Sequence, residues 1–374
     1  MGRKAWVAVA ALATGAAGLA WAARDIPVAY GAEPSGQRAE RVRRSPQYRD
    51  GAFHNEHETP MQFHPATNAD DRHRLRQILT DTDSRKPGGE IPVVADVPPD
   101  VAAPDGLHVT WFGHASSLVE IDGSRVLFDP IWSDRCSPSR LAGPHRLHPV
   151  PIPLEDLPAI DVIVISHDHY DHLDMNSIVW LARNHSAPFV VPLGVGSHLE
   201  SWHVPADRII ELDWHDATTV GNLTLTATPG QHFSGRKIAK RNYTLWSSWV
   251  VAGPMHRVFY SGDTGYSDSF AKVGEQYGPF DATLIQIGAY DSGWPDIHMT
   301  PEDGVATHLD VRGGLMIPVH WGTFVLAFHP WAEPADRAWE ESKARGVNLA
   351  LPRPGQRIDV ADPPAIDGWW QTLA

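Results

Sequence analysis

Short apolar runs separated by turn-forming residues recur along the chain from residue 107 to residue 319. Asp122 and Gly123 predict a hairpin turn near the start of this region. The early runs form hairpins and the later ones alternate with helical segments, which predicts a mixed α/β fold. Runs rich in β-branched and aromatic residues predict strands at 107–112, 117–121, 125–128, 161–166, 189–192, 208–212, 223–227, 249–251, 257–260, 282–287 and 315–319. Helices are predicted at 71–79, 175–183 and 301–309.

An apolar run at the N-terminus precedes this patterned region. Arg3 and Lys4 come before residues 5–23, which contain no charged side chain. Positive charge, an apolar run and a small-x-small sequence (A-W-A, 20–22) are typical of a signal peptide or a membrane anchor, predicted here over residues 1–23. Because the positive charges precede the run, we expect the rest of the chain outside the cytoplasm, in the periplasm if the source is bacterial.

Residues 24–104 form a polar, proline-containing extension that leads into a catalytic domain predicted at 105–374. His54 and His57 stand apart from the other candidate metal ligands, and we interpret them as packing residues of the extension. An arginine-rich patch in the extension is compatible with a solvated linker face or with contact to anionic lipid headgroups. Its members are Arg38, Arg41, Arg43, Arg44 and Arg49.

Charge and cysteine content exclude several classes of function. The net charge is -14, from 31 Lys+Arg against 45 Asp+Glu, so we expect no nucleic-acid partner. A phosphate-bearing substrate remains compatible, because bound metal can supply local positive charge. Cys136 is the one cysteine, which rules out an intrachain disulfide and a thiolate-only zinc site. It has no identified partner base, so we do not expect it to act as a nucleophile, and the 21 histidines become the candidate metal ligands.

The strongest chemical signal is S-H-D-H-Y-D-H-L at 166–173, between a predicted buried strand and a predicted helix. A loop at a rigid strand end can aim several closely spaced ligands at one point. We interpret Asp168 as a surface or helix-start residue rather than a ligand. More ligand-type residues follow later strands, and together they predict a two-metal site. The candidates are His167, His169, Asp171, His172, His232, Asp263 and His320.

The order H-x-H-x-D-H, then H, D and H after successive strands, resembles the metallo-β-lactamase superfamily. Within it, the chain resembles the N-acyl-phosphatidylethanolamine-hydrolysing phospholipase D family from about residue 51 to about residue 352. The motifs that carry this closer resemblance are T-W-F-G-H-A (110–115), D-P-I-W-S (129–133), S-P (137–138), G-P (143–144), N-S (176–177), E-L-D-W (211–214), L-W-S-S-W (245–249), G-D-T-G-Y (262–266), G-P-F-D (278–281), I-G-A-Y (287–290) and H-W-G-T-F (320–324).

The resemblance implies an αββα sandwich with two zinc ions at one edge of the sheets. Carried over residue by residue, His167, His169 and His232 would hold the first ion and Asp171, His172 and His320 the second, with Asp263 bridging both.

Other residues near these motifs have expected roles. Asp171 would also orient or deprotonate the attacking water. His298 aligns with a family histidine and would bind phosphate or assist the leaving group, with a helix-entry residue as the alternative. His114 is either a residue behind the ligands or a structural turn residue. Asp129 is expected to bond loop backbone or to orient a ligand histidine.

The leading hypothesis is therefore hydrolysis of N-acyl-phosphatidylethanolamine or a related phospholipid, of the phospholipase D type. A membrane surface is the expected partner, and a homo-oligomer is left open. The alternatives are a lactonase of the same fold, a β-lactamase and a non-catalytic zinc-stabilised binding module. β-Lactam hydrolysis is disfavoured because Asp263 stands where a cysteine would be expected.

Overall fold

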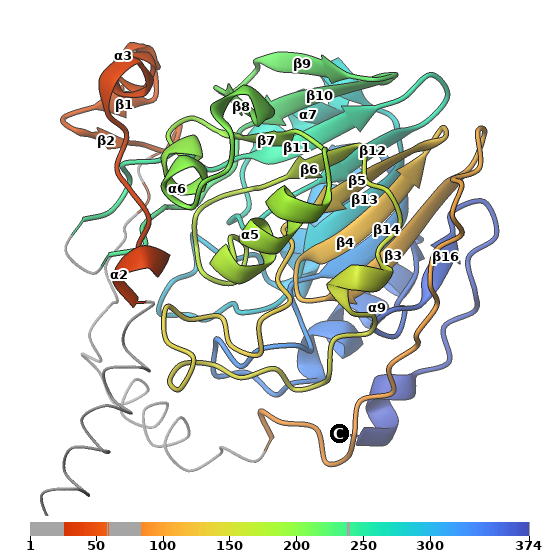
Figure 1. Cartoon of the computed structure of the whole chain (residues 1–374). Coiled ribbons are helices and arrows are strands. Elements are labelled where there is room, and N and C mark those ends of the chain that lie inside the picture. The colour runs from red at the N-terminus through yellow and green to blue at the C-terminus, as the bar shows by residue number, and fades with distance from the viewer. Residues whose placement is uncertain (1–25, 58, 60–83, 238–239, 374) are drawn as a thin grey trace, which may run out of the picture.

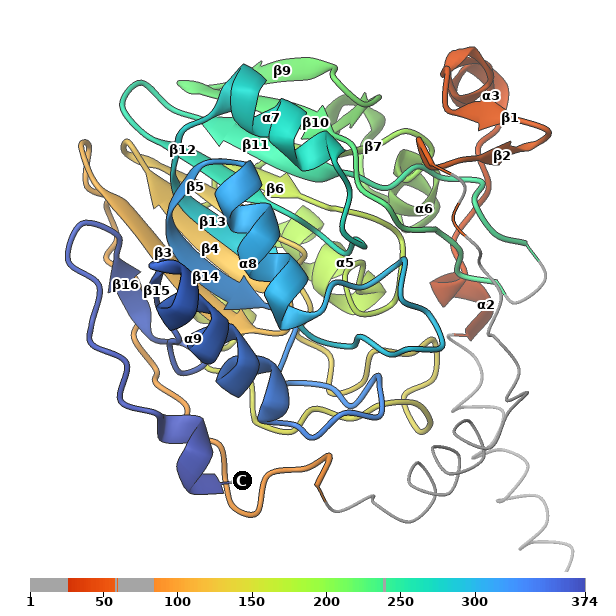
Figure 2. The ribbon, with the colours of Figure 1, turned by 180° about the vertical axis from the view of Figure 1, so that it is seen from behind.

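The computed structural model of the chain describes residues 26–57, 59, 84–237 and 240–373. In these residues two seven-stranded sheets face each other, and helices cover the outer face of each sheet (Figures 1 and 2). The predicted αββα sandwich is therefore confirmed. The N-terminal apolar run and the helix predicted at 71–79 lie outside the described residues. None of the helices in the described ranges combines the length and the apolarity that crossing a membrane requires.

The first sheet contains β16 (Arg357–Asp359), β3 (Leu107–Gly113), β4 (Ser116–Ile121), β5 (Ser124–Phe128), β6 (Val162–Val164), β7 (Phe189–Pro192) and β8 (Ile209–Leu212), in that order. β3 to β5 pair antiparallel, with the predicted turn joining β4 and β5, and β5 to β8 are parallel. Helices α5 (Met175–Asn184) and α6 (Gly196–Ser201) lie on its outer face.

The strands of this sheet are buried on both faces. Leu118 and Leu127 belong to the apolar cluster under α5 and α6, while their neighbours Val119 and Val126 belong to the core between the sheets. Successive side chains of a strand point to opposite faces, so both sets must be apolar. This explains why β6 and its neighbours appear in the sequence as nearly continuous apolar runs.

The second sheet contains β15 (Asn348–Leu349), β14 (Gly313–Val319), β13 (Phe280–Gln286), β12 (Arg257–Tyr260), β11 (Ser248–Ala252), β10 (Leu223–Thr228) and β9 (Ala217–Val220), in that order. β9 to β12 pair antiparallel and β12 to β15 are parallel. Helices α7 (Ser269–Tyr277), α8 (Pro301–Asp310) and α9 (Glu333–Arg345) cover its outer face (Figure 2).

Strand direction determines where the functional loops lie. β4 is antiparallel to both of its neighbours, so β3 and β5 run in the same direction, and β6 runs parallel to β5. In the second sheet β10, β12 and β14 share one direction for the same reason. The carboxyl ends of β6, β10, β12 and β14 are followed by the seven predicted metal ligands, so these ligands gather at one edge of the sandwich.

The N-terminal extension is bound to this sandwich through α2 (Ile26–Ala29), α3 (Gly36–Arg44) and the hairpin of β1 (Tyr48–Arg49) and β2 (Ala52–Phe53). Arg38 Nε lies 2.7 Å from Glu211 Oε2, and Arg41 donates a hydrogen bond to the Glu211 carbonyl. Glu211 is only 4% exposed. The interpretation of the arginine patch as a solvated linker face is therefore wrong for Arg38, whose side chain is only 15% exposed. Arg41 also anchors the extension, but its side chain remains 50% exposed.

Some elements were not predicted from the sequence. β9 is a short strand that is mostly exposed, so its sequence carries little apolar signal. Much of the buried face of α9 consists of Pro334, Ala335, Ala338 and Ser342, whose small side chains give a weak helical periodicity. β9 forms because it pairs with β10 at the edge of the sheet, and α9 forms because it packs on the outer face of the second sheet.

We expect Arg38→Met to lower the free energy of unfolding by about 3 kcal/mol, because it removes the closer of the two cations beside the buried Glu211 carboxylate and leaves only Arg41, at 3.9 Å. Chemical denaturation would measure the change. Arg43→Met is the matched control, because Arg43 is exposed on the same helix. Equal stability of the two variants would contradict the anchoring role of Arg38.

Candidate metal centre

The seven ligand-type residues that the sequence singled out lie in one region at the carboxyl edge of the strands. Their nitrogen and oxygen atoms form overlapping groups, and within each group the atoms lie within 4.8 Å of one another. The loop between β6 and α5 carries four of them, and the loops after β10, β12 and β14 carry one each. These residues are His167, His169, Asp171, His172, His232, Asp263 and His320.

The first group consists of His167, His169 and His232. Nε2 of His167 lies 2.8 Å from Nδ1 of His169, and Nε2 of His232 lies 3.2 Å from the same atom. His232 Nδ1 faces the Ile297 carbonyl at 2.9 Å. A carbonyl only accepts hydrogen bonds, so the proton lies on Nδ1 and the Nε2 lone pair of His232 points inward. A cation shared by the three rings would satisfy these converging nitrogens.

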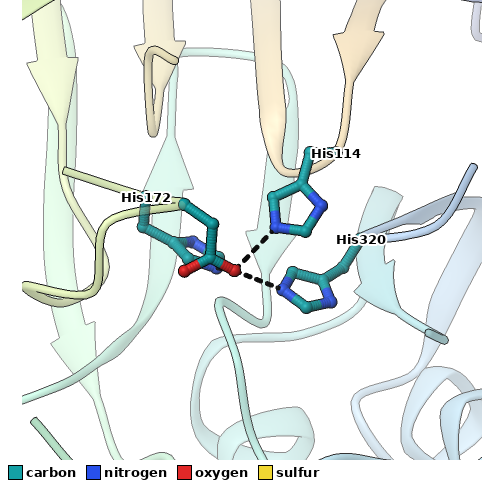
Figure 3. A group of neighbouring side chains, drawn as sticks. His114, His172 and His320 are labelled. Carbon is teal, nitrogen blue, oxygen red and sulfur yellow. Dashed lines mark hydrogen bonds and ion pairs between the residues drawn. The ribbon is translucent and has the colours of Figure 1, made fainter. Parts of the chain in front are cut away.

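The second group consists of Asp171, His172, His320 and, in addition, His114. Figure 3 shows the three imidazole rings gathered around one carboxylate, with dashed lines from it to His114 and His320. Asp171 Oδ2 lies 2.8 Å from Nε2 of His114 and 3.3 Å from Nε2 of His320. This geometry offers a second metal position, with one more histidine than the sequence had assigned to it.

Asp263 lies between the two groups. Its Oδ2 atom is 3.1 Å from His172 Nε2 and 3.0 Å from His320 Nε2. The same atom is 3.9 Å from Nε2 of both His167 and His232. A carboxylate in this position can contact a cation in either group, which is the geometry that a bridging ligand requires.

Asp129 supports the second group from behind. It is fully buried, and its Oδ2 atom lies 2.7 Å from Nδ1 of His172. Ser166 donates to the same carboxylate through its backbone N–H, and Tyr260 through its hydroxyl. Because Nδ1 of His172 donates to Asp129, Nε2 faces the centre and can offer its lone pair to a metal that displaces the proton it carries in the metal-free protein. Both roles expected for Asp129, bonding loop backbone and orienting a ligand histidine, are therefore confirmed.

The histidines of the centre differ in protonation state, and together they balance the charges of Asp171 and Asp263. Burial lowers the pKa of His167 and His232 well below the ordinary histidine value, so both are neutral. Burial acts in the same direction on His320, but the carboxylates of Asp263 and Asp171 outweigh it and raise the pKa of His320 to about 9. Without a bound cation, protons on such histidines balance the two acids. Divalent metal would replace those protons.

Several buried polar atoms of the centre have no hydrogen-bond partner among the described residues. They include His172 Nε2, Asp263 Oδ1 and His298 Nδ1. Buried polar atoms are rarely left unpaired, so these atoms point to a missing partner. Imidazole nitrogens and carboxylate oxygens suit zinc and similar divalent ions. The donor set therefore fits the metal ions that the sequence implied.

His298 lies at the rim of this centre, next to the N-terminus of α8. Its Nδ1 atom is 4.0 Å from Asp263 Oδ2, and its ring centroid is 5.2 Å from that of His232. Its side chain remains 13% exposed. Burial lowers its pKa to about 4, so the imidazole is neutral at pH 7. The residue is therefore positioned to contact a ligand that reaches the metals.

The sequence left the role of His114 open. Its backbone has a positive φ of 51°, and its carbonyl accepts hydrogen bonds from Trp111 Nε1 and from the N–H of His320. Thr323 Oγ1 lies 2.6 Å from its backbone nitrogen. This turn aims the imidazole at Asp171. A histidine after a G-H turn was the available signal, but the direction of its ring depends on contacts with a loop more than 200 residues away.

The interpretation of Asp168 as a surface or helix-start residue is wrong. Its side chain is fully buried, and it accepts hydrogen bonds from His198 Nε2, Thr244 Oγ1 and the N–H of Gly235. Within the H-D-H sequence it points away from the predicted metal ligands and joins their loop to α6 and to the loop between β10 and β11. A single sequence gives no sign of this burial, because the partners lie 30 to 76 residues away.

The remaining candidates lie outside the centre. His57 is exposed and faces Asp268 at 3.0 Å, and His54 contacts the Arg49 carbonyl. Neither belongs to a potential metal group among the described residues. Cys136 is buried, and burial raises the pKa of its thiol well above the ordinary value, which fits the expectation that it is not a nucleophile.

Comparisons with known proteins agree with this geometry. Residues 124–321 match the family described as "Beta-lactamase superfamily domain". The chain is 49% identical over 376 residues to an uncharacterized protein of Mycobacterium tuberculosis, with 96% of this chain and 98% of that protein covered. It is 39% identical over 258 residues to N-acyl-phosphatidylethanolamine-hydrolyzing phospholipase D 1 of Caenorhabditis elegans, covering 66% of this chain and 72% of the relative.

Solved structures show the same fold at low sequence identity. Igni18, a metallo hydrolase from Ignicoccus hospitalis, matches with a TM-score of 0.53 and 22% identity, over 67% of this chain and 97% of that one. An isothiocyanate hydrolase from Delia radicum gut bacteria matches with a TM-score of 0.53 and 19% identity, over 69% and 100%. At these identities the likeness concerns the fold.

We expect Asp129→Asn to weaken metal binding about 10- to 100-fold, because an amide cannot accept all the hydrogen bonds that orient His172. Competition with a chelator would measure the affinity. Tyr260→Phe, which keeps the contact between Asp129 and His172, serves as the control and should have a much smaller effect. Unchanged affinity in Asp129→Asn would refute the orienting role.

Metal binding should also depend on pH through His320. Its pKa of about 9 in the metal-free protein means that a bound metal must displace a proton at any lower pH. The affinity should therefore rise with pH at least up to about pH 9, because Asp263 and Asp171 also raise the pKa of His172 well above the ordinary histidine value despite its burial. Isothermal titration at pH 7.5 in two buffers of different ionisation enthalpy should detect released protons. Identical heats in both buffers would contradict this expectation.

Proposed function

This chain is a metal-dependent hydrolase of the metallo-β-lactamase superfamily, and we propose that it hydrolyses the phosphodiester of N-acyl-phosphatidylethanolamine or a related phospholipid. The reaction is of the phospholipase D type and uses two zinc ions. Its products are phosphatidic acid and an N-acylethanolamine. The likeness to the Caenorhabditis elegans phospholipase D supports this choice of substrate class.

The position of Asp263 is the observation that carries the proposal. Its carboxylate lies within 3.1 Å of two histidines of the second group and 3.9 Å from two histidines of the first. A pair of ions bridged in this way would lower the pKa of bound water and stabilise negative charge on a phosphoryl group. Phosphodiester hydrolysis needs both effects, since attack on phosphorus builds charge on its oxygens.

Asp171 would orient the attacking water. Its Oδ2 atom is held by His114 and His320, while its side chain is 15% exposed and can be reached from solvent. The carboxylate is well suited to accept a hydrogen bond from water, because the histidines around it keep its pKa well below the ordinary value despite burial. It would therefore align the water rather than carry its proton away.

His298 would bind the phosphate of the substrate. A neutral imidazole at pH 7 donates one N–H and carries no charge, which favours a hydrogen bond to a phosphoryl oxygen over donation of a proton to the leaving group. Its buried Nδ1 atom lies 4.0 Å from Asp263 Oδ2, while 13% of its side chain remains exposed to solvent. We therefore favour the phosphate-binding role for His298 over leaving-group assistance.

Apolar side chains on the loops around the centre support a lipid surface as partner. Leu141 is 63% exposed in the loop region after β5, and Phe328 is 39% exposed in the loop region after β14. Both strands end at the edge that carries the metal ligands. Exposed apolar residues on loops that leave this edge are compatible with contact to lipid chains. Export or anchoring through residues 1–23, with the catalytic part outside the cytoplasm, would bring the site to such a surface.

The full chain, loaded with zinc in mixed micelles of N-acyl-phosphatidylethanolamine, tests this function. We expect phosphatidic acid and N-acylethanolamine by mass spectrometry, and we expect a chelator to abolish the reaction. Asp263→Asn should reduce the rate by at least about 10³-fold, since it removes the charge shared by both ions.

Asp362→Asn is the matched control, because this exposed carboxylate follows β16 and belongs to no potential metal group. It should retain the wild-type rate. Two bound metals without cleavage of any phosphodiester would reject the phospholipase assignment. Faster turnover of soluble lactones than of lipid diesters would favour a lactonase instead.

A further inference from the structure

The N-terminal extension reaches the metal centre through one side chain. The hairpin of β1 and β2 delivers Asn55 to the loop that carries His232. Asn55 Oδ1 lies 3.0 Å from the backbone nitrogen of His232, and Asn55 Nδ2 lies 2.9 Å from the His232 carbonyl. The amide therefore pairs with the peptide groups of a candidate ligand in the way that one strand pairs with another.

The Asn55 amide is fully used in this position. Oδ1 also accepts from Trp246 Nε1 at 2.9 Å, and Nδ2 also lies 3.0 Å from Thr59 Oγ1. Two donors meet the oxygen and two acceptors meet the nitrogen, which fixes the orientation of the amide. Of the uncharged side chains, only the amides of Asn and Gln offer both a carbonyl oxygen and an NH₂ group, and Gln is longer by one methylene group.

The peptide groups of His232 depend on this contact. His232 is fully buried, and no other hydrogen bond to its backbone N–H or carbonyl is present among the described residues. Its ring is held separately by the Ile297 carbonyl. The residue before it, Gln231, pairs with Gly265 on the opposite side. Without Asn55, two buried peptide groups would lose their partners, at a cost of about 1–3 kcal/mol each.

The extension that carries Asn55 is positioned without help from the metals. Phe53, two residues earlier, is fully buried in a cluster with Leu193, Trp214 and Trp246, and its N–H donates to the Asn242 carbonyl. Earlier in the chain, the ion pair between Arg38 of α3 and the buried Glu211 fixes the same N-terminal segment. Asn55 therefore reaches His232 from a rigid support, which is the condition for holding a ligand in place.

We propose that Asn55 is a positioning residue that holds His232 toward His167 and His169, so that the segment 26–57 is a structural part of the metal centre. The inference rests on the proposed two-metal site. This proposal gives a function to the segment 26–57, for which the sequence alone indicated only a polar, proline-containing extension. The ion held by the first group should depend on Asn55 much more than the ion held by the second group.

The test measures both zinc affinities of the full chain by competition with a chelator. Asn55→Leu keeps a similar volume without polar atoms, and Asn55→Ala leaves room for water. We expect the first-group ion to bind about 10- to 100-fold more weakly in Asn55→Leu, with a smaller loss in Asn55→Ala, and the second-group affinity to stay within about twofold. If Asn55→Leu does not fold, Asn55→Ala carries the comparison.

Asn222→Leu is the matched control. Its side chain also bonds a neighbouring turn, accepting a hydrogen bond from Ser124 Oγ and donating one to the Asp122 carbonyl, near the opposite end of the strands. Both zinc affinities should be unchanged in this variant. Affinities in the Asn55 variants within twofold of wild type would overturn the inference. Equal weakening of both ions, with a lower melting temperature of the metal-free protein, would also overturn it, because it indicates a purely structural contact.

The same experiment separates this inference from the proposed function. Wild-type protein that binds two zinc ions and cleaves the lipid, beside Asn55 variants of unchanged affinity, would reject the role of Asn55 alone. Wild-type protein that binds no zinc would reject the two-metal site and the inference with it.

Discussion

The structure depends on one electrostatic constraint, the burial of two carboxylates among histidines at the carboxyl edge of the strands. Asp171 and Asp263 are taken out of water together with neutral imidazoles whose lone pairs converge. Such a group is costly to bury unless positive charge is shared among its members. Protons on His172 and His320 provide that charge in the metal-free protein, and divalent metal can take their place. The surrounding fold holds the ligand side chains in place while metal replaces these protons.

Support for the ligands comes from several directions. Asp129 fixes His172 from inside the first sheet, the Ile297 carbonyl fixes the ring of His232, and Asn55 holds its backbone from the extension. Each contact pairs a polar group of the histidine that faces away from the centre, and leaves the Nε2 atom that faces the centre available to a metal. The extension therefore belongs to the same functional unit as the sandwich. The comparatively open sides are those of Asp171 and His298, where a substrate would enter.

Much of the fold was predictable because both sheets are buried on both faces. A strand such as β6 must be apolar at every position, and its sequence therefore stands out. The helices α5 and α8 were also predicted from the sequence. Elements with small or exposed residues, such as β9 and α9, gave no such signal. Their conformation is imposed by neighbours that are distant in the sequence.

The sequence by itself determined the fold class, the identity of the seven ligand-type residues and their order along the chain, because strand ends and ligand types are local features. Only the tertiary structure decided which side chains stand behind the ligands. His114 and Asn55 contact the centre across more than 50 residues, and Asp168 points away from it despite its place between two candidate ligands. The direction of a side chain in a loop depends on hydrogen bonds to distant backbone, and those partners become neighbours only when the two sheets pack together.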